Sequence, residues 1–352
     1  MPSIQLLRII DASLNRASEG LRVVEDYARF ALDDPFLTSE FKSLRHELTA
    51  AAGTILPADR HAARDTPHDV GTRLSTPGEQ DRSDVWAVCQ ANLKRTEQSL
   101  RSLEEYGKLA DVGFAQCIEA LRYRLYTLEK ALDMGRTSRE WLQGVRLCVL
   151  VDGWKSEAEF ERLVASLVAA GVGMIQLRDT KLDDRKLIRR ARILRQQTRE
   201  FPTLAIINDR ADVTAITNAD GVHIGQEDLS VKEARTIVGM RGLVGVSTHN
   251  IGQARAAVLD GANYLGAGPT FPSSTKEFAT FAGLDYLRQV AQEIRLPTFA
   301  IGGITAQNLP DVLATGITRI AVSGAVTGSS EPVSAVQELS SMLSESASAP
   351  IC

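Results

Sequence analysis

The spacing of hydrophobic residues changes near residue 145, and this change limits what the chain can fold into. Residues 4–134 place apolar side chains every three or four positions, the spacing of one helix face. From about residue 145, short β-branched runs alternate with segments of helix length. The sequence therefore predicts an all-α N-terminal domain over residues 1–138 and an α/β domain over residues 144–346.

The first domain contains two similar helical segments. LNRASEGLRVVEDY, starting at Leu14, aligns with LKRTEQSLRSLEEY, starting at Leu93, at an offset of 79 residues. The repeat predicts two similar helices, and a third helix over residues 115–134 closes this half. Residues 60–84, rich in Pro, Gly, Asp and Arg, read as a loop, and residues 135–144 as the linker.

Eight buried-type strands are expected in the second domain. The runs lie at residues 145–152, 173–179, 203–209, 220–228, 243–249, 262–269, 297–304 and 318–326. Most are separated by helix-like crossovers long enough to join parallel strands, which favours a (β/α)8 TIM barrel. A doubly wound open sheet is the alternative, although the first strand is not followed by a GxGxxG loop.

Composition narrows the class of protein. The 352 residues are 44 % hydrophobic and 24 % charged, with a net charge of −4, which is ordinary globular usage and gives no basic domain for nucleic acid. There is neither an apolar run of membrane-spanning length nor a signal-like start, so we expect no membrane association. The four cysteines lack metal-binding spacing, which is typical of a reducing, cytoplasmic location.

Polar residues follow the apolar runs at the ends where a barrel builds its active site. They are Gln176, Arg178, Asn208, Asp209, His223, Gln226, Asp228, Ser247 and His249. Asp209 and Asp228 would end adjacent strands and hold Mg²⁺ through oxygen atoms, or else cap the following helices. Arg178 and Lys276 add positive charge, so the site suits a diphosphate, although either residue alone is more often a surface charge. His223 is interpreted as a buried core residue.

Glycines and small polar residues follow the last two strands. Gly302-Gly303 and Ser323-Gly324 would let backbone N–H groups approach a phosphate monoester, or would only turn the chain. No Ser-His-Asp or Cys-His arrangement supports covalent catalysis.

These motifs together resemble thiamine phosphate synthases. The resemblance covers about residues 145–345 and rests on QLRD, ND, HIGQED, GVSTH, GPTFPSSTK, IGGI and VSG, in the order of that family. It implies an enzyme that joins a pyrimidine diphosphate to a thiazole phosphate and releases pyrophosphate, with Mg²⁺ as cofactor. Alternatives are a thiazole tautomerase-like barrel and a regulatory protein that binds thiamine precursors.

The resemblance assigns roles by position. Arg178, Lys276 and Ser247 would be catalytic residues, with Arg178, Lys276 and Mg²⁺ stabilising the leaving group, and Asp209 and Asp228 would hold Mg²⁺. Contacts to the pyrimidine diphosphate would come from Gln176, Leu177, Arg178, Asp179, Thr180, Asn208, Ser247 and Lys276. Contacts to the thiazole phosphate would come from Ser273, Ser274, Thr275, Gly302, Gly303, Val322 and Ser323. The family usually has lysine where this chain has Thr180, so either Lys181 replaces that charge or the diphosphate is held more weakly.

The N-terminal segments RIIDASLNRASEGLRVVEDYARF and RDTPHDVGT look like a helical module fused ahead of some of these synthases and suspected of phosphorylating the pyrimidine monophosphate. Arg8, Asp11, Asn15, Arg22 and Asp26 repeat at helical spacing and would line such a site, or would form a solvated face. A dimerisation module is the other interpretation, so a homo-oligomer is left open. The expected partners are small-molecule substrates.

Overall fold

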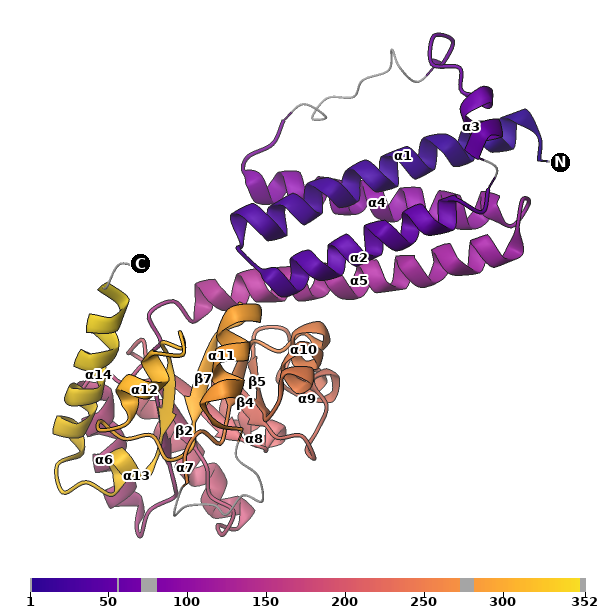
Figure 1. The fold of residues 1–352 in the computed structure, drawn as a ribbon. Helices are drawn as coiled ribbons and strands as arrows, with labels where there is room; N and C mark the ends of the chain where they lie inside the picture. The colour runs from indigo at the N-terminus through magenta and orange to yellow at the C-terminus, as the bar shows by residue number, and fades with distance from the viewer. Residues whose placement is uncertain (1, 56, 71–80, 273–281, 349–352) are drawn as a thin grey trace. The chain divides into compact units, whose positions relative to one another are not determined.

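The computed structural model describes residues 2–55, 57–70, 81–272 and 282–348. The chain divides into two compact units, Met1–Leu132 and Asp133–Cys352. The first unit is helical and the second is built on parallel strands (Figure 1).

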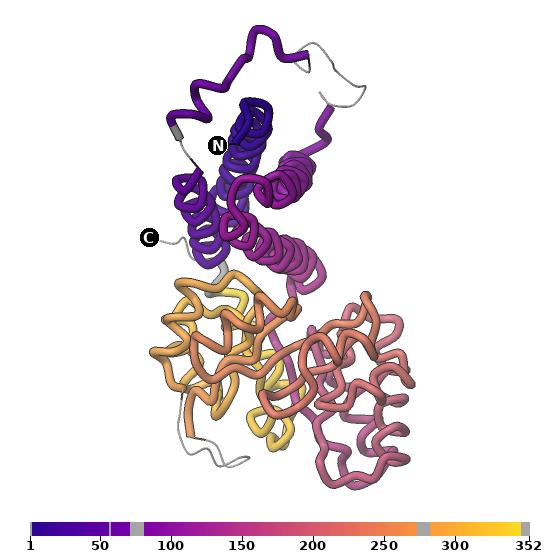
Figure 2. The backbone as a smooth tube through the Cα atoms, turned by 90° about the vertical axis from the view of Figure 1, so that its right-hand side faces the viewer, coloured from indigo at the N-terminus to yellow at the C-terminus, as the bar shows by residue number. Residues whose placement is uncertain are grey.

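Four long helices form the first unit and run side by side (Figures 1 and 2). The helical elements are α1 (Ile4–Asp26), the π-helical turn η1 (Tyr27–Ala31), α2 (Pro35–Ala52), α3 (Pro57–Ala63), α4 (Val85–Gly107) and α5 (Val112–Trp141). Side-chain oxygens of Ser3, Asp34 and Asp84 accept backbone hydrogen bonds at the starts of α1, α2 and α4. These N-caps satisfy amides that the first helical turn leaves without partners.

The structure corrects two boundaries and adds two helices. Residues 35–52 form α2, which the periodicity did not separate from its neighbours, and residues 60–63 belong to α3 rather than to a loop. The predicted linker is helical as far as Trp141. Gly135 alone weakens a helix by about 1 kcal/mol, and the Arg136–Glu140 ion pair in the next turn offsets part of that loss.

The two similar segments are α1 and α4, and they pack against each other. A Cβ atom at Gly20 of α1 would collide with the Thr96 hydroxyl of α4, so glycine allows this close approach. Each segment also buries one glutamate against an arginine of the next long helix. The Arg45 Nε–Glu25 Oε2 and Arg122 Nε–Glu104 Oε2 distances are 2.8 and 2.7 Å. The internal repeat therefore extends to the pairing of buried charges.

The second unit is a closed barrel of eight parallel strands in the order β1 to β8, which confirms the TIM barrel. Leu147 of β1 pairs with Ile320 of β8, and this contact rules out the open sheet. The strands are β1 (Leu147–Val151), β2 (Met174–Leu177), β3 (Leu204–Asn208), β4 (Gly221–Ile224), β5 (Leu243–Thr248), β6 (Tyr264–Ala267), β7 (Thr298–Ile301) and β8 (Ile320–Val322).

Helices alternate with these strands. They are α6 (Glu157–Ala169), α7 (Asp184–Thr198), α8 (Ala211–Thr217), α9 (Val231–Val238), α10 (Ile251–Asp260), α11 (Gly283–Glu293), α12 (Leu309–Leu313), α13 (Gly324–Thr327) and α14 (Pro332–Ser348). Because side chains alternate between the two faces of a strand, every second strand residue points into the barrel interior. Cys148, Met174, Ile206 and Phe299 fill it, each at most 2 % exposed.

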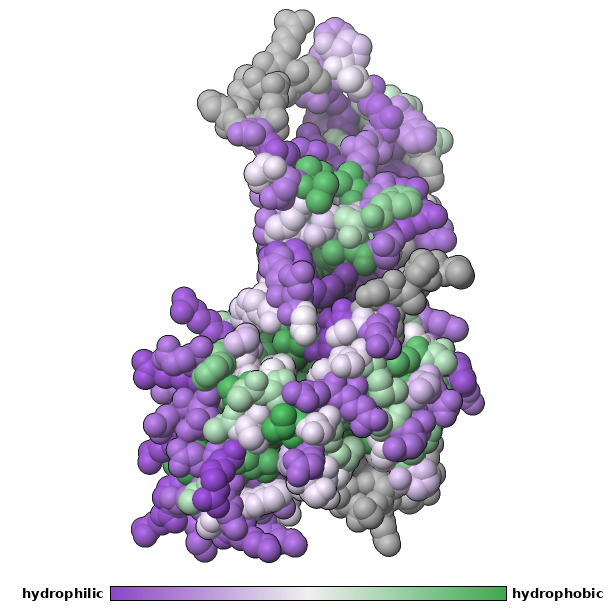
Figure 3. All heavy atoms as spheres, turned by 90° about the vertical axis from the view of Figure 1, so that its left-hand side faces the viewer, coloured by the Kyte–Doolittle hydropathy of each residue, from purple (hydrophilic) through white to green (hydrophobic). Residues whose placement is uncertain are grey.

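The face shown in Figure 3 is mostly hydrophilic, with smaller hydrophobic areas between the hydrophilic residues. Within the described ranges, no helix has both the length and the apolar character needed to cross a bilayer.

Candidate active site

A cavity of about 1080 Å³ opens at the carboxyl ends of the strands. Every strand contributes residues to its wall, either from within the strand or from the segment that follows it, as expected for a parallel barrel. The structure brings the following predicted residues together there: Gln176, Arg178, Asp179, Thr180, Asn208, Asp228, Ser247, Gly302, Gly303, Val322 and Ser323. Leu177 and Asp209 do not line the cavity, and Ser273, Ser274, Thr275 and Lys276 lie outside the described residues.

Two residues that are predicted to contact the pyrimidine form a hydrogen bond with each other. Gln176 in β2 donates from Nε2 to Oδ1 of Asn208 at the end of β3, over 2.7 Å. This hydrogen bond leaves the side-chain oxygen Oε1 of Gln176 and the side-chain NH₂ group of Asn208 to face a ligand. Leu177, between Gln176 and Arg178, is 1 % exposed, because strand alternation turns it toward the surrounding helices.

The loop after β2 is fixed by one carboxylate. Asp179 accepts hydrogen bonds from the amides of Gly153, Leu182 and Lys181, at 2.9, 3.1 and 2.7 Å. Partial burial acts to raise the pKa of Asp179, but these backbone bonds outweigh it and lower that pKa. The loop carries Thr180 and Lys181 on the cavity wall, so Lys181 stands at the mouth where the family places its lysine one residue earlier.

His223 in β4 is buried, as the sequence predicted, and it also forms part of the cavity wall. Its Nε2 lies 2.9 Å from the Ser247 hydroxyl and its Nδ1 lies 3.3 Å from the Tyr264 hydroxyl. Burial first, and then the charge of Arg178, lower the pKa of His223 to about 4. The ring is therefore neutral at physiological pH, with one nitrogen accepting and the other donating.

The loop after β7 contains two glycines with positive φ angles. Gly302 and Gly303 have φ of 102° and 64°, and a Cβ atom at Gly303 would collide with the backbone oxygen of Pro272. Asn308 donates to the Gly303 carbonyl oxygen at 2.9 Å and holds the loop. After β8, the Ser323 hydroxyl donates to the Leu150 carbonyl oxygen at 3.1 Å. At this end, the cavity wall therefore consists of backbone atoms and small side chains.

The two acidic residues proposed for metal binding lie in the segments that follow neighbouring strands. Asp209 follows β3 with φ of 60°, and its amide donates to the His223 carbonyl oxygen at 2.7 Å. Asp228 is exposed on the cavity wall and accepts a hydrogen bond from the Gly225 amide at 2.7 Å. Neither carboxylate caps a helix with its side chain in the described structure.

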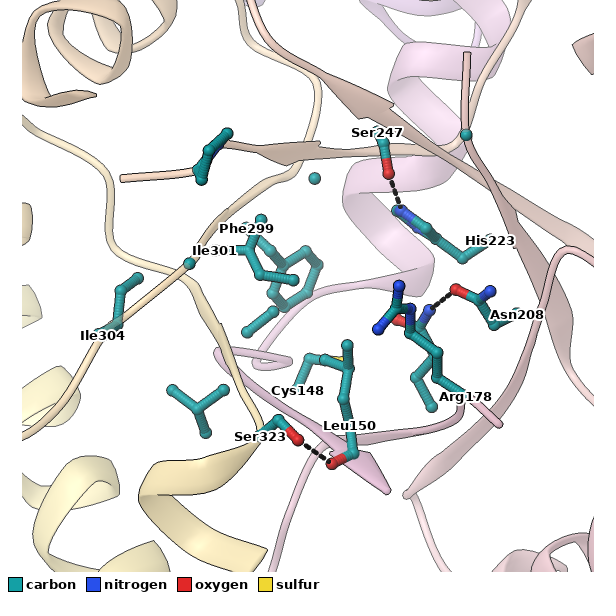
Figure 4. A pocket seen from close by; sticks show the side chains of 18 of the residues that line it. Cys148, Leu150, Arg178, Asn208, His223, Ser247, Phe299, Ile301, Ile304 and Ser323 are labelled. Carbon is teal, nitrogen blue, oxygen red and sulfur yellow. Dashed lines mark hydrogen bonds between the residues drawn. The ribbon is translucent and has the colours of Figure 1, made fainter. Parts of the chain in front are cut away.

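The cavity has a polar side and an apolar side (Figure 4). Arg178, Asn208, His223 and Ser247 form the polar side, and Phe299, Ile301 and Ile304 lie across from them. Sequence reasoning missed the apolar side, together with Tyr264, whose ring lies 5.4 Å from that of His223. Their sequence pattern is that of ordinary core residues, and only closure of the barrel brings them together on the cavity wall.

Fold and cavity together define a TIM-barrel enzyme whose site has a polar, cationic end and a glycine-rich end suited to phosphorylated compounds. Residues 147–326 match the family described as thiamine monophosphate synthase, TMP-TENI, and residues 8–131 match the ThiD2 family.

Curated relatives match over nearly the whole chain. A thiamine-phosphate synthase of Rhodopirellula baltica is 45 % identical, over 91 % of this chain and 88 % of the relative. One of Synechocystis is 40 % identical, over 96 % of each. A solved thiamine phosphate pyrophosphorylase from Pyrococcus furiosus superposes with a TM-score of 0.52 at 34 % identity, over 57 % of this chain and 96 % of that one.

The chain belongs to the thiamine-phosphate synthase family, EC 2.5.1.3, and carries an N-terminal ThiD2 domain. Full-length similarity to synthases favours this activity over the tautomerase-like and regulatory alternatives.

Proposed function

We propose that the barrel cavity joins 4-amino-2-methyl-5-hydroxymethylpyrimidine diphosphate to 4-methyl-5-(2-phosphoethyl)thiazole, giving thiamine phosphate and pyrophosphate. The observation that supports this most is the division of one cavity into two ends. Gln176, Asn208 and Arg178 gather at one end, and the Gly302-Gly303 loop with Ser323 forms the other. One chamber would therefore hold both substrates side by side.

The chemistry needs positioning more than acid–base groups. The 4-amino group donates electron density through the pyrimidine ring, so the CH₂–O bond weakens and the diphosphate leaves with its electron pair. The thiazole nitrogen lone pair then forms the new C–N bond to the CH₂ carbon. No proton is transferred in these two bond changes, so a neutral His223 on the wall is consistent with them.

Each residue has a specific part in the proposal. Arg178 would stabilise the charge that develops on the departing diphosphate. Ser247 would donate its one hydroxyl proton to the diphosphate while its oxygen accepts from Nε2–H of the neutral His223 ring. Lys276, outside the described residues, joins Arg178 on the strength of the sequence alone. Gly303 and Ser323 would hold the thiazole phosphate, while Gln176 and Asn208 would orient the pyrimidine amino group.

Asp228 offers carboxylate oxygens for Mg²⁺ on the cavity wall. Asp209 follows the adjacent strand but does not line the cavity, so its part as a second ligand rests on the sequence alone. No cluster of three His, Cys, Asp or Glu side chains suited to a metal occurs among the described residues. Two carboxylates suit an ion that takes its remaining ligands from phosphate oxygens and water. When bound, the ion would neutralise charge on the diphosphate.

We also propose that the helical unit phosphorylates the pyrimidine monophosphate, and that oligomerisation is the competing role. Arg8, Asp11 and Asn15, which the sequence placed on one helix face, line a polar cavity in this unit. Arg22 and Asp26 do not line it and instead form an ion pair with each other.

The test is a pair of assays on the full-length chain with Mg²⁺. The first supplies pyrimidine diphosphate and thiazole phosphate, and the second supplies pyrimidine monophosphate, ATP and thiazole phosphate. Thiamine phosphate from both supports both proposals. Product from the first mixture alone limits the helical unit to a structural or oligomerisation role, and absence of product from the first mixture contradicts the barrel assignment.

A further inference from the structure

Arg190 of α7 is a buried arginine that does not line the barrel cavity, although it contacts a loop that does. The residue is 5 % exposed, and its guanidinium lies 5.8 Å from the centre of the Phe160 ring. Its Nε atom donates a hydrogen bond to the backbone carbonyl oxygen of Gly153, over 2.7 Å. Burial of a guanidinium is unfavourable unless its donors find acceptors, so this hydrogen bond offsets part of the loss of hydration.

The other polar contact of Arg190 is with Glu157, in the first turn of α6. The Arg190 Nη1–Glu157 Oε1 distance is 3.1 Å, but the Glu157 side chain is 48 % exposed and also lies 2.8 Å from Nε of Arg189. An ion pair this exposed contributes little to stability. The buried hydrogen bond to Gly153 is therefore the contact that distinguishes Arg190 from its neighbour Arg189.

Gly153, in the loop after β1, is held at both of its backbone groups. Arg190 binds its carbonyl oxygen, and its amide donates to Oδ2 of Asp179 at 2.9 Å. The other oxygen of Asp179, Oδ1, accepts the amides of Lys181 and Leu182 at 2.7 and 3.1 Å. A continuous set of hydrogen bonds thus joins α7 to the loop after β1 and then to the loop after β2. We call Arg190, Gly153 and Asp179 the loop clamp.

The turn that the loop clamp holds has an unusual backbone. Trp154 has φ of 56°, in the left-handed region that residues with a side chain disfavour, and its amide donates to Oδ1 of Asp152 at 2.9 Å. Such a conformation persists where the surrounding structure fixes it. The turn is continuous with the cavity, because Asp152 lines the wall and the Arg178 amide donates to the Val151 carbonyl oxygen at 2.8 Å. Release of the turn would therefore disturb this part of the wall.

We propose that Arg190 is a positioning residue for the diphosphate end of the barrel cavity. It acts through Gly153 and Asp179, which hold the loop that places Thr180 and Lys181 on the cavity wall. A cationic group fixed before the substrate arrives loses less conformational freedom on binding than one on a mobile loop. That the bound group is a diphosphate rests on the function proposed above, whereas the loop clamp itself does not.

Two replacements of similar shape separate the hydrogen bond from the bulk of the side chain. Arg190→Gln places its side-chain NH₂ group where Nε of arginine stands, so it can still donate to the Gly153 carbonyl oxygen. Arg190→Met places a methyl group there and has no donor. Both variants lose the guanidinium and its contact with Glu157. A difference between the two variants therefore reports the hydrogen bond to Gly153.

The first test is steady-state kinetics on the full-length chain with Mg²⁺. We expect Arg190→Met to raise KM for the pyrimidine diphosphate about tenfold with little change in KM for the thiazole phosphate, and Arg190→Gln to recover most of the loss. Arg189→Met is the matched control, because it removes a Glu157 contact and leaves the Gly153 hydrogen bond intact. Equal KM values in Arg190→Met and Arg190→Gln, or an equal rise for both substrates, overturn the proposal.

If Arg190→Met does not fold, Asp179→Asn decides. Asparagine has one acceptor oxygen for the three amides that Asp179 binds, so the loop clamp weakens and KM for the pyrimidine diphosphate should rise about fivefold. Charge alone would have the opposite effect, because loss of a carboxylate reduces repulsion of a diphosphate. An unchanged or lower KM in Asp179→Asn contradicts the proposal.

Hydrogen exchange of the ligand-free chain, followed by mass spectrometry, tests the loop clamp without turnover. Peptides covering residues 151–155 and 178–183 should exchange faster in Arg190→Met than in Arg190→Gln. If the wild type makes no thiamine phosphate, the proposed function fails, and pyrophosphate affinity measured by calorimetry in the same variants replaces KM. Normal turnover with equal exchange and equal KM values in the two variants keeps the function and removes the positioning role.

Discussion

The His223 imidazole lies 2.9 Å from the Ser247 hydroxyl, and the pair links the buried interior of the barrel to the wall of its cavity. Tyr264 contacts the other ring nitrogen at 3.3 Å, so the ring is held from both ends. A ring that cannot turn orients the Ser247 hydroxyl in one direction, which is what a group facing a leaving diphosphate needs.

The buried histidine should make stability fall in mild acid. Its pKa drops from 6.5 to about 4 on folding, so between these pH values the unfolded chain binds a proton at His223 and the folded chain does not. This group stabilises the fold fully above pH 6.5, and its contribution is lost as pH falls toward 4, on the order of 3 kcal/mol. Urea unfolding of the wild type and of His223→Gln at pH 7, 5.5 and 4.5 measures this contribution to the free energy of unfolding. If the free energies of the two proteins change equally with pH, His223 does not have the lowered pKa.

Alanine at Gly303 should weaken binding of the thiazole phosphate. A Cβ atom there would collide with the Pro272 oxygen, and positive φ adds about 1–2 kcal/mol of strain. Gly283→Ala is the control, because Gly283 has φ of 69° but nothing within 4 Å of the added atom. We expect KM for the thiazole phosphate to rise about tenfold or more only in Gly303→Ala. Equal values in the two variants would remove the close approach as the cause.

Lys181 should carry part of the diphosphate charge that Thr180 does not supply. Lys181→Ala is expected to raise KM for the pyrimidine diphosphate about tenfold with little change for the thiazole phosphate. Introducing Thr180→Lys into that variant should restore binding. Lys186→Ala, an exposed lysine paired with Asp183 at the start of α7, serves as the control. If Lys181→Ala behaves like this control, Lys181 does not replace the family lysine.

Removing a carboxylate at the strand ends should raise the Mg²⁺ requirement. Asp209→Asn keeps a residue that tolerates the φ of 60° and weakens the proposed ligand. Half-maximal turnover should then need more than about tenfold more Mg²⁺, as expected when a hard oxygen ligand is lost. The exposed Asp285→Asn on α11 should match the wild type. Unaltered Mg²⁺ dependence in Asp209→Asn would exclude Asp209 as a ligand.

Much of the fold follows from local pattern. The eight apolar runs became β1 to β8 because strands buried on both faces need continuous apolar sequence. Their connection lengths favour parallel pairing, and parallel pairing places every carboxyl end on one rim. The sequence alone therefore predicts that Gln176, Asn208 and Ser247 lie at a common rim, and all three line the cavity.

Helix boundaries were less predictable. α2 and the extension of α5 to Trp141 depend on weak local preferences, which a cap or an ion pair can reverse. The Asp34 cap of α2 and the Arg136–Glu140 pair of α5 each add a few tenths to about one kcal/mol to these helices.

The sequence by itself determined the two classes of periodicity, the order of the strands along the chain and the polar residues at their ends. Tertiary structure alone decided that β8 closes on β1, that His223 contacts Ser247, and that Arg64 pairs with Asp11. The physical reason is separation along the chain. His223 and Ser247 are 24 residues apart and Asp11 and Arg64 are 53 apart, so only packing of distant segments brings them into contact.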